Sequence, residues 1–147
     1  HRDLHSFPTR RSSDLIKRKL IEMNTLFLVY LIAEALFGLG FLFLPAALMG
    51  PMGVTLDETS ITFARMFGSL IISIPFLLYF ARKSANPEFK KAVVYCVLVY
   101  LFVSTIILLL AQLRGLMNSL GWSVVLLHFA FFLWFGYHAL AIRKASE

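Results

Sequence analysis

The feature that most constrains this chain is a set of four long apolar runs separated by short polar connections. The runs cover about residues 25–44, 62–81, 92–111 and 121–142. An α-helix needs about 20 residues to cross a hydrocarbon core about 30 Å thick. The sequence therefore predicts an all-α, four-helix transmembrane bundle with up-down-up-down topology and helices at about 24–44, 58–81, 91–112 and 120–142.

The distribution of basic residues predicts the orientation of this bundle. An even number of spans puts both termini on one side, and that side has six basic residues outside the N-terminal segment, whereas the opposite connections contain only Arg114. Basic connections stay in the cytoplasm. We therefore predict cytoplasmic termini, outward loops at 45–61 and 112–120, and a multi-pass protein of the inner (cytoplasmic) membrane. The six basic residues are Arg82, Lys83, Lys90, Lys91, Arg143 and Lys144.

The first fifteen residues, HRDLHSFPTRRSSDL, are similar to the translation of a common sequencing adapter. They lack the apolar core and cleavage site of a signal peptide. We expect residues 1–15 to be an adapter-derived artefact that does not pack against the helices. Residues 16–22 are either a translated leader before Met23 or a basic N-terminus, so the true start stays open. Residues 23–147 are expected to form a single four-span domain.

The overall charge of the chain reflects membrane orientation and not nucleic-acid binding. The full chain is formally +6 with a pI near 9.8, but from Met23 onward eight basic and five acidic residues leave only +3. A hydrophobic content of 59% and a mean hydropathy of +0.79 are typical of a bilayer protein. The sequence thus predicts membrane lipid, and no nucleic acid, as a partner. Cys96 is the only cysteine, which excludes an intrachain disulfide.

Glu34 is the most informative single residue, because it lies near the middle of the first apolar run. An acidic side chain at that depth costs a few kcal/mol on insertion scales. A membrane protein tolerates this cost when the carboxyl group is paired, protonated or functional. Two interpretations therefore stand together: a structural hydrogen bond or ion pair inside the bundle, and a functional ionisable site.

Arg65 is the predicted partner of Glu34. It lies early in the second helix, which is joined to the first by a short loop and should run antiparallel beside it. A carboxylate and a guanidinium form a bidentate pair that lowers the cost of burying both charges. We predict that Glu34 faces the bundle interior and pairs with Arg65 directly or through water. Ser69 shares the Arg65 face through i, i+4 spacing.

Further polar residues cluster near the same end of the bundle and complete a candidate intramembrane polar site. A single histidine on an apolar helix face is usually a core residue whose hydrogen bonds are made within the protein. His128 has no second histidine or thiol at the spacing of metal ligands, so no metal is predicted. The chain contains no recognised catalytic motif, which predicts no catalytic residue and no cofactor. The candidate site consists of Glu34, Arg65, Ser69, Gln112, Asn118 and His128.

Several strings resemble a known group of proteins. A first span ending at Pro45 is followed by GVTLD, by FARMFG in the second span, and by LAQLRGLMNSLGW between the last two spans. In this order they resemble small uncharacterised bacterial four-span integral membrane proteins, loosely DoxX-like. The resemblance covers nearly all of residues 23–142. It implies the four-span fold and carries no activity to transfer.

Three functions follow as hypotheses. The first is a non-enzymatic accessory protein, or a module that binds a lipid or small hydrophobic molecule. The second is a proton-coupled small-molecule transporter, since a glutamate in mid-span, preceded by alanine, resembles the small multidrug-resistance exporters. The third is a membrane subunit of a redox or lipid-modifying enzyme, which DoxX-like kinship allows. A homo-oligomer or a partner membrane protein fits each of them, and the ligand and oligomeric state stay open.

Overall fold

The computed structural model describes residues 10–144, and side chains from 21 to 142. Within this range the chain is helical and contains no strand. The elements follow one another as α1 (Arg10–Phe43), α2 (Pro45–Met49), the 3-10 turn η1 (Gly50–Met52), α3 (Glu58–Ile71), α4 (Ser73–Lys83), α5 (Pro87–Leu113) and α6 (Gly121–Lys144).

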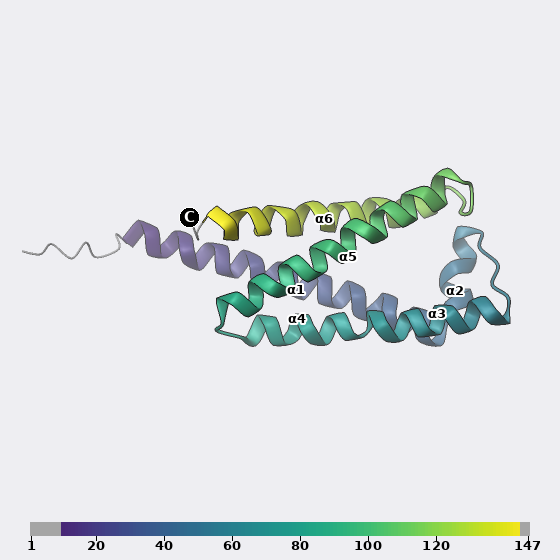
Figure 1. Cartoon of the computed structure of the whole chain (residues 1–147), viewed down its shortest axis with the longest axis horizontal. Coiled ribbons are helices and arrows are strands. Elements are labelled where there is room, and N and C mark those ends of the chain that lie inside the picture. The colour runs from purple at the N-terminus through teal and green to yellow at the C-terminus, as the bar shows by residue number, and fades with distance from the viewer. Residues whose placement is uncertain (1–9, 145–147) are drawn as a thin grey trace, which may run out of the picture.

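Four stretches of helix are long and apolar enough to cross a membrane: Ile21–Phe43, Glu58–Lys83, Pro87–Leu113 and Gly121–Ile142. They run up, down, up and down in chain order, which confirms the predicted four-helix bundle (Figure 1). The chain is therefore a membrane protein. Which membrane it occupies, and on which side its termini lie, stay predictions.

Most helix ends lie within two residues of the predicted ones, but α5 begins at Pro87 and not near residue 91, and the start of the chain also differs. The first helix begins at Arg10 and not near residue 24, so residues 16–22 continue the first span as helix. Lys and Arg are good helix formers, and nothing in this segment breaks a helix. Residues 1–9, and the side chains of 10–15, lie outside the described part, so the expected lack of packing by residues 1–15 stays a prediction.

The second span is broken into two helices, α3 and α4, close to Pro75. Pro75 has no backbone N–H and its ring would clash with the carbonyl of residue 71, so a regular helix cannot continue through this point. The break falls at Ile72, between α3 and α4. At the start of α3, the Ser60 backbone N–H donates to Asp57 Oδ1 at 2.7 Å, which makes Asp57 the N-cap. Hydrogen bonds from Ser60 hold the pKa of the Asp57 carboxyl group below its ordinary value.

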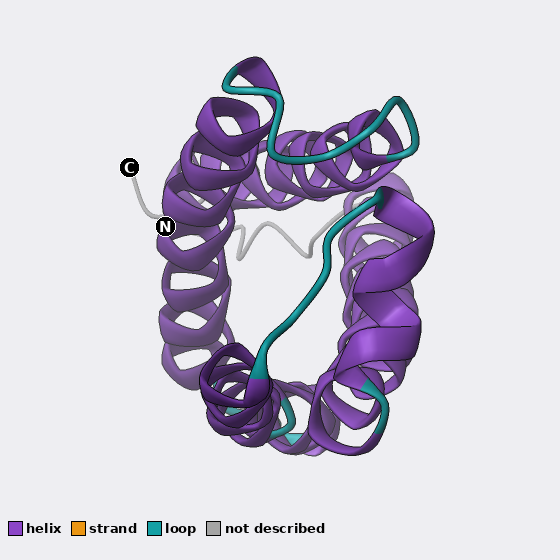
Figure 2. Ribbon diagram, turned by 90° about the vertical axis from the view of Figure 1, so that its right-hand side faces the viewer, coloured by secondary structure: helices purple, strands orange, loops and turns teal. Residues whose placement is uncertain are grey.

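The four spans form two helical hairpins that diverge toward one end. α1 packs on α3 and α4, whereas α5 packs on α6. Figure 1 shows α5 beginning beside α4 and rising to α6, so the hairpins separate toward the end that carries α2, η1 and the connections 53–57 and 114–120. We call this the loop end, and the opposite end the terminal end. Figure 2 looks onto the loop end, which the connection 53–57 crosses.

The terminal half of the bundle holds the packed core. Phe27 and Tyr30 of α1 meet Phe131 and Phe135 of α6, with ring centroids 4.8 Å apart for Tyr30–Phe131 and 5.1 Å for Tyr30–Phe135. Leucines, valines and alanines of α4 and α5 close this cluster: Leu78, Ala81, Val93, Val94, Val97 and Leu101. The core thus joins the two hairpins at the terminal end and leaves the loop half less filled.

Candidate functional site

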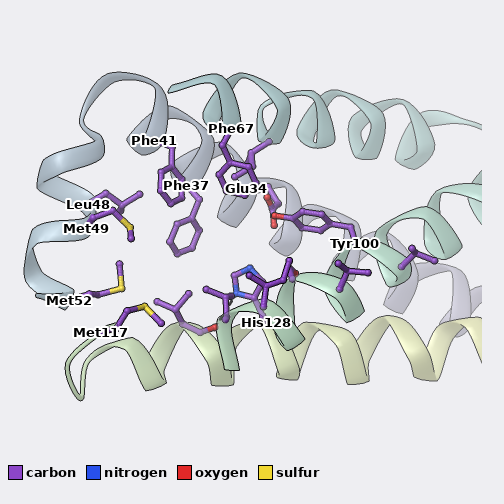
Figure 3. Close-up of a pocket in the computed structure, with 17 residues that line it drawn as sticks. Glu34, Phe37, Phe41, Leu48, Met49, Met52, Phe67, Tyr100, Met117 and His128 are labelled. Carbon is purple, nitrogen blue, oxygen red and sulfur yellow. Dashed lines mark hydrogen bonds between the residues drawn. The ribbon is translucent and has the colours of Figure 1, made fainter. Parts of the chain in front are cut away.

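A pocket of about 470 Å³ lies between the two hairpins in the loop half of the bundle (Figure 3). Its volume falls within the range of about 300–1,000 Å³ found for small-molecule sites. Every long element except α4 contributes to its walls. The lining residues are Glu34, Phe37, Phe41, Leu48, Met49, Met52, Phe67, Ile71, Val99, Tyr100, Val103, Ser104, Ile107, Leu108, Met117, Val124 and His128.

The polar side chains of the pocket gather at its inner end. Glu34 is only 4% exposed and lies nine positions before the end of α1, roughly 14 Å along the helix. Figure 3 shows the Tyr100 hydroxyl group directed toward the Glu34 carboxyl group, and His128 of α6 also lines this end of the pocket. Tyr100 of α5 and Tyr30 of α1 both interact electrostatically with Glu34. The prediction that Glu34 faces the interior therefore agrees with its burial.

The other end of the pocket is apolar and rich in sulfur. Leu48 and Met49 of α2, Met52 of η1 and Met117 of the second connection line it together (Figure 3). Unbranched, polarizable methionine side chains adapt to partners of irregular shape. This end is thus suited to an apolar group whose shape is not tightly specified.

Asn118, in the second connection of the loop end, is hydrogen-bonded to η1 in the first connection. Its backbone N–H donates to Met52 O at 2.8 Å, and its Nδ2 donates to Pro51 O at 2.9 Å. Gly53 beside it has a φ of +80°, a conformation that favours glycine, and a Cβ there would lie 3.4 Å from Asn118 Nδ2. The side chain of Gln112, near the end of α5, donates from Nε2 to Asn118 O at 3.0 Å. The candidate residues Gln112 and Asn118 therefore organise the cover of the pocket, and do not line it.

Arg65 and Ser69 are not part of this site. Both are exposed, and neither lines the pocket. Phe67 faces the pocket. Residues two positions apart in an α-helix point in directions about 200° apart around its axis, so Arg65 lies on nearly the opposite side of α3. In the described part of the chain Glu34 forms no ion pair, so the structure does not bring Arg65 to it as predicted. Ser69 instead donates its hydroxyl to Met66 O at 2.7 Å.

Because Arg65 points outward, replacing Arg65 by glutamine is expected to leave the melting temperature in detergent nearly unchanged. Exposed substitutions of this kind change stability by about 0.5 kcal/mol or less. Loss of a buried pair would cost about 3–5 kcal/mol and be partly rescued in the Glu34→Gln/Arg65→Gln double variant. Thermal unfolding of both single variants and of the double variant checks this prediction. Additive losses of stability agree with the structure. A double variant more stable than the sum of the single losses would instead support the predicted Glu34–Arg65 ion pair.

Tyr100 and the methionines are the pocket residues that sequence reasoning missed. A tyrosine within an apolar run most often packs in a core, so its hydroxyl group gave no separate signal. Met49 and Met52 lie in the first connection and Met117 lies in the second, so the chain does not mark them as one end of a pocket until α2 and η1 fold over the bundle. In the part of the chain that the structure describes, no three His, Cys, Asp or Glu side chains come together as a metal site. The arrangement is suited to noncovalent binding by apolar walls with one polar end.

Comparison with known proteins identifies the family. Residues 28–146 match the domain of unknown function DUF8292. The chain belongs to this family. No curated protein and no solved structure matches it. The DUF8292 match begins before Glu34 and runs beyond α6, so the whole pocket lies within the DUF8292 domain. The bacterial, DoxX-like resemblance stays a prediction.

Proposed function

We propose that this DUF8292 protein is a non-enzymatic module of the cytoplasmic membrane that binds a lipid or another small hydrophobic molecule. The pocket between the hairpins carries the proposal. Its walls are formed almost entirely by aromatic, aliphatic and methionine side chains, and its volume suits a small ligand. A few polar groups at one end of an apolar cavity typically fix the orientation of a ligand.

The lateral side of the pocket supports a ligand that is dissolved in the bilayer. Val99, Val103 and Ile107 line the pocket, yet they are 64%, 48% and 61% exposed on the surface of α5. On the neighbouring hairpin Phe67 of α3 is 42% exposed and also lines the pocket. In a membrane these surfaces face hydrocarbon, so an apolar molecule has a path from the lipid into the pocket.

The covered loop end supports the same route. The Asn118 hydrogen bonds hold η1 against the second connection, and the side chains of Met52 and Met117 are buried beneath them. Water-soluble molecules would have to open this cover, whereas molecules in the lipid would not. With the loop end facing outward, as the basic residues predict, the ligand would come from the outer leaflet.

A variant that fills the pocket tests the proposal. Ser104→Phe places a large ring into the pocket, and Ala130→Phe, on an exposed position of α6, is the matched control. Native mass spectrometry of the wild-type protein, purified in mild detergent with a total lipid extract, should show a bound hydrophobic molecule. We expect Ser104→Phe to lose at least about tenfold of this adduct and Ala130→Phe to keep it. No adduct on the wild type, or equal adducts on both variants, would contradict the proposal.

A proton-coupled transporter is the second candidate, because Glu34 lies in the pocket and forms no ion pair with a described residue. A transporter must release its ligand on the other side of the membrane, whereas a binding module retains it. Proteoliposomes with an imposed proton gradient distinguish the two. Substrate movement that depends on the gradient and is lost in Glu34→Gln would favour transport.

A further inference from the structure

Two hydrogen-bond donors at the polar end of the pocket, those of Ser104 and His128, are already engaged by their own helices. The Ser104 hydroxyl donates to Leu101 O at 3.2 Å. His128 Nδ1 lies 3.0 Å from Val124 O, and because a carbonyl oxygen only accepts, Nδ1 must carry the hydrogen. The remaining lone pairs of the Ser104 oxygen and, in a neutral ring, of His128 Nε2 are therefore acceptors.

Glu34 adds two further acceptor oxygens when it is ionised. The pocket lining contains no lysine or arginine, and among the described residues none forms an ion pair with Glu34. A carboxylate in an apolar site is costly unless a cation lies beside it. Tyr100 and Tyr30, which both interact with Glu34, carry hydroxyl groups that can donate as well as accept. The polar end thus offers mainly acceptors, and it has a place for a positive charge that the protein does not supply.

From this arrangement we propose that the ligand is an apolar molecule with a protonated primary or secondary amine, seated against Glu34. This inference rests on the proposed function. The N–H groups of the amine would donate to Glu34 and His128 Nε2, and its charge would offset that of the carboxylate. The apolar part would extend along Phe37 and Phe41 toward the methionines at the loop end.

A series of photoreactive probes that differ only in the head group tests this inference. Each probe is a twelve-carbon alkyl chain with a diazirine near its end, and the heads are primary ammonium, trimethylammonium, hydroxyl and carboxylate. The full chain in phosphatidylcholine nanodiscs is irradiated with each probe, and labelled peptides are quantified by mass spectrometry. We expect the ammonium probe to label the pocket at least about tenfold more than the trimethylammonium probe, which has the same charge but no N–H donor.

The Glu34→Gln variant should reduce labelling by the ammonium probe at least about tenfold and leave labelling by the hydroxyl probe unchanged, which also reports that the pocket is still folded. Ser69→Ala, outside the pocket, should change neither. Equal labelling by all four probes, or by both cationic probes, would overturn the proposal that the ligand carries an amine. It would leave the proposed binding of a hydrophobic molecule standing. A preference for the hydroxyl or carboxylate probe would overturn it too. If no probe labels the pocket, the proposed function itself fails.

Discussion

Replacing Gly68 by alanine is expected to lower the melting temperature of the detergent-solubilised protein strongly. α3 crosses α1 at this glycine, where an added Cβ would lie 2.6 Å from Leu42 N, 2.9 Å from Gly38 O and 2.9 Å from Phe41 C. All three atoms belong to the backbone, so they cannot turn aside as a flexible side chain would. The helices must move apart, and such overpacking costs about 1–3 kcal/mol or more. Small residues at helix crossings allow this close approach in membranes.

Gly136→Ala is the matched control, because it makes the same substitution in α6 with room for the methyl group. Its Cβ would lie 3.9 Å from Leu98 Cδ1, an ordinary van der Waals distance. Alanine favours a helix over glycine by up to about 1 kcal/mol, so this variant should be neutral or slightly more stable. Thermal unfolding followed by circular dichroism measures both variants. Equal melting temperatures would mean that α1 and α3 do not approach closely at Gly68.

Replacing Phe135 by alanine is expected to give the second large loss, because this ring joins the two hairpins. Its side chain is fully buried, and its centroid lies 5.1 Å from Tyr30 and 6.2 Å from Phe27. In a bilayer the gain from association is mainly packing, so the cavity left behind removes contacts that lipid cannot easily replace. Phenylalanine-to-alanine changes in buried cores cost about 3–5 kcal/mol in water, and we expect about 2 kcal/mol or more here.

Phe63→Ala provides the comparison for this loss. Phe63 lies on α3 and is 65% exposed, so lipid surrounds it before and after the substitution. Its removal should change the melting temperature little. The melting temperatures of the two variants and of the wild type, measured in the same detergent, test this prediction. Similar losses for both would indicate that the terminal core does not hold the hairpins together.

The sequence by itself determined the spans and most of their ends. Length and hydropathy suffice for the spans, because every backbone polar group in a bilayer must be bonded within a helix. The N-cap at Asp57 and the interruption near Pro75 are local in the same sense, since each depends on neighbours within one turn. The starts of the first and third spans were the exceptions, because residues 10–22 and 87–90 form helix outside the apolar runs.

Only the tertiary structure decided which face of each helix turns inward. In a soluble protein an apolar stripe marks the buried face, but here lipid and bundle interior are both apolar, so the pattern does not distinguish them. The sequence paired Glu34 with Arg65 because the first two spans are neighbours. Packing of α3 at Gly68 instead turns Arg65 outward, and the crossing of the two hairpins places Tyr100 and His128 in the same pocket as Glu34. The rotation of α3 and the angle between the hairpins come from contacts between distant residues, which no local pattern records.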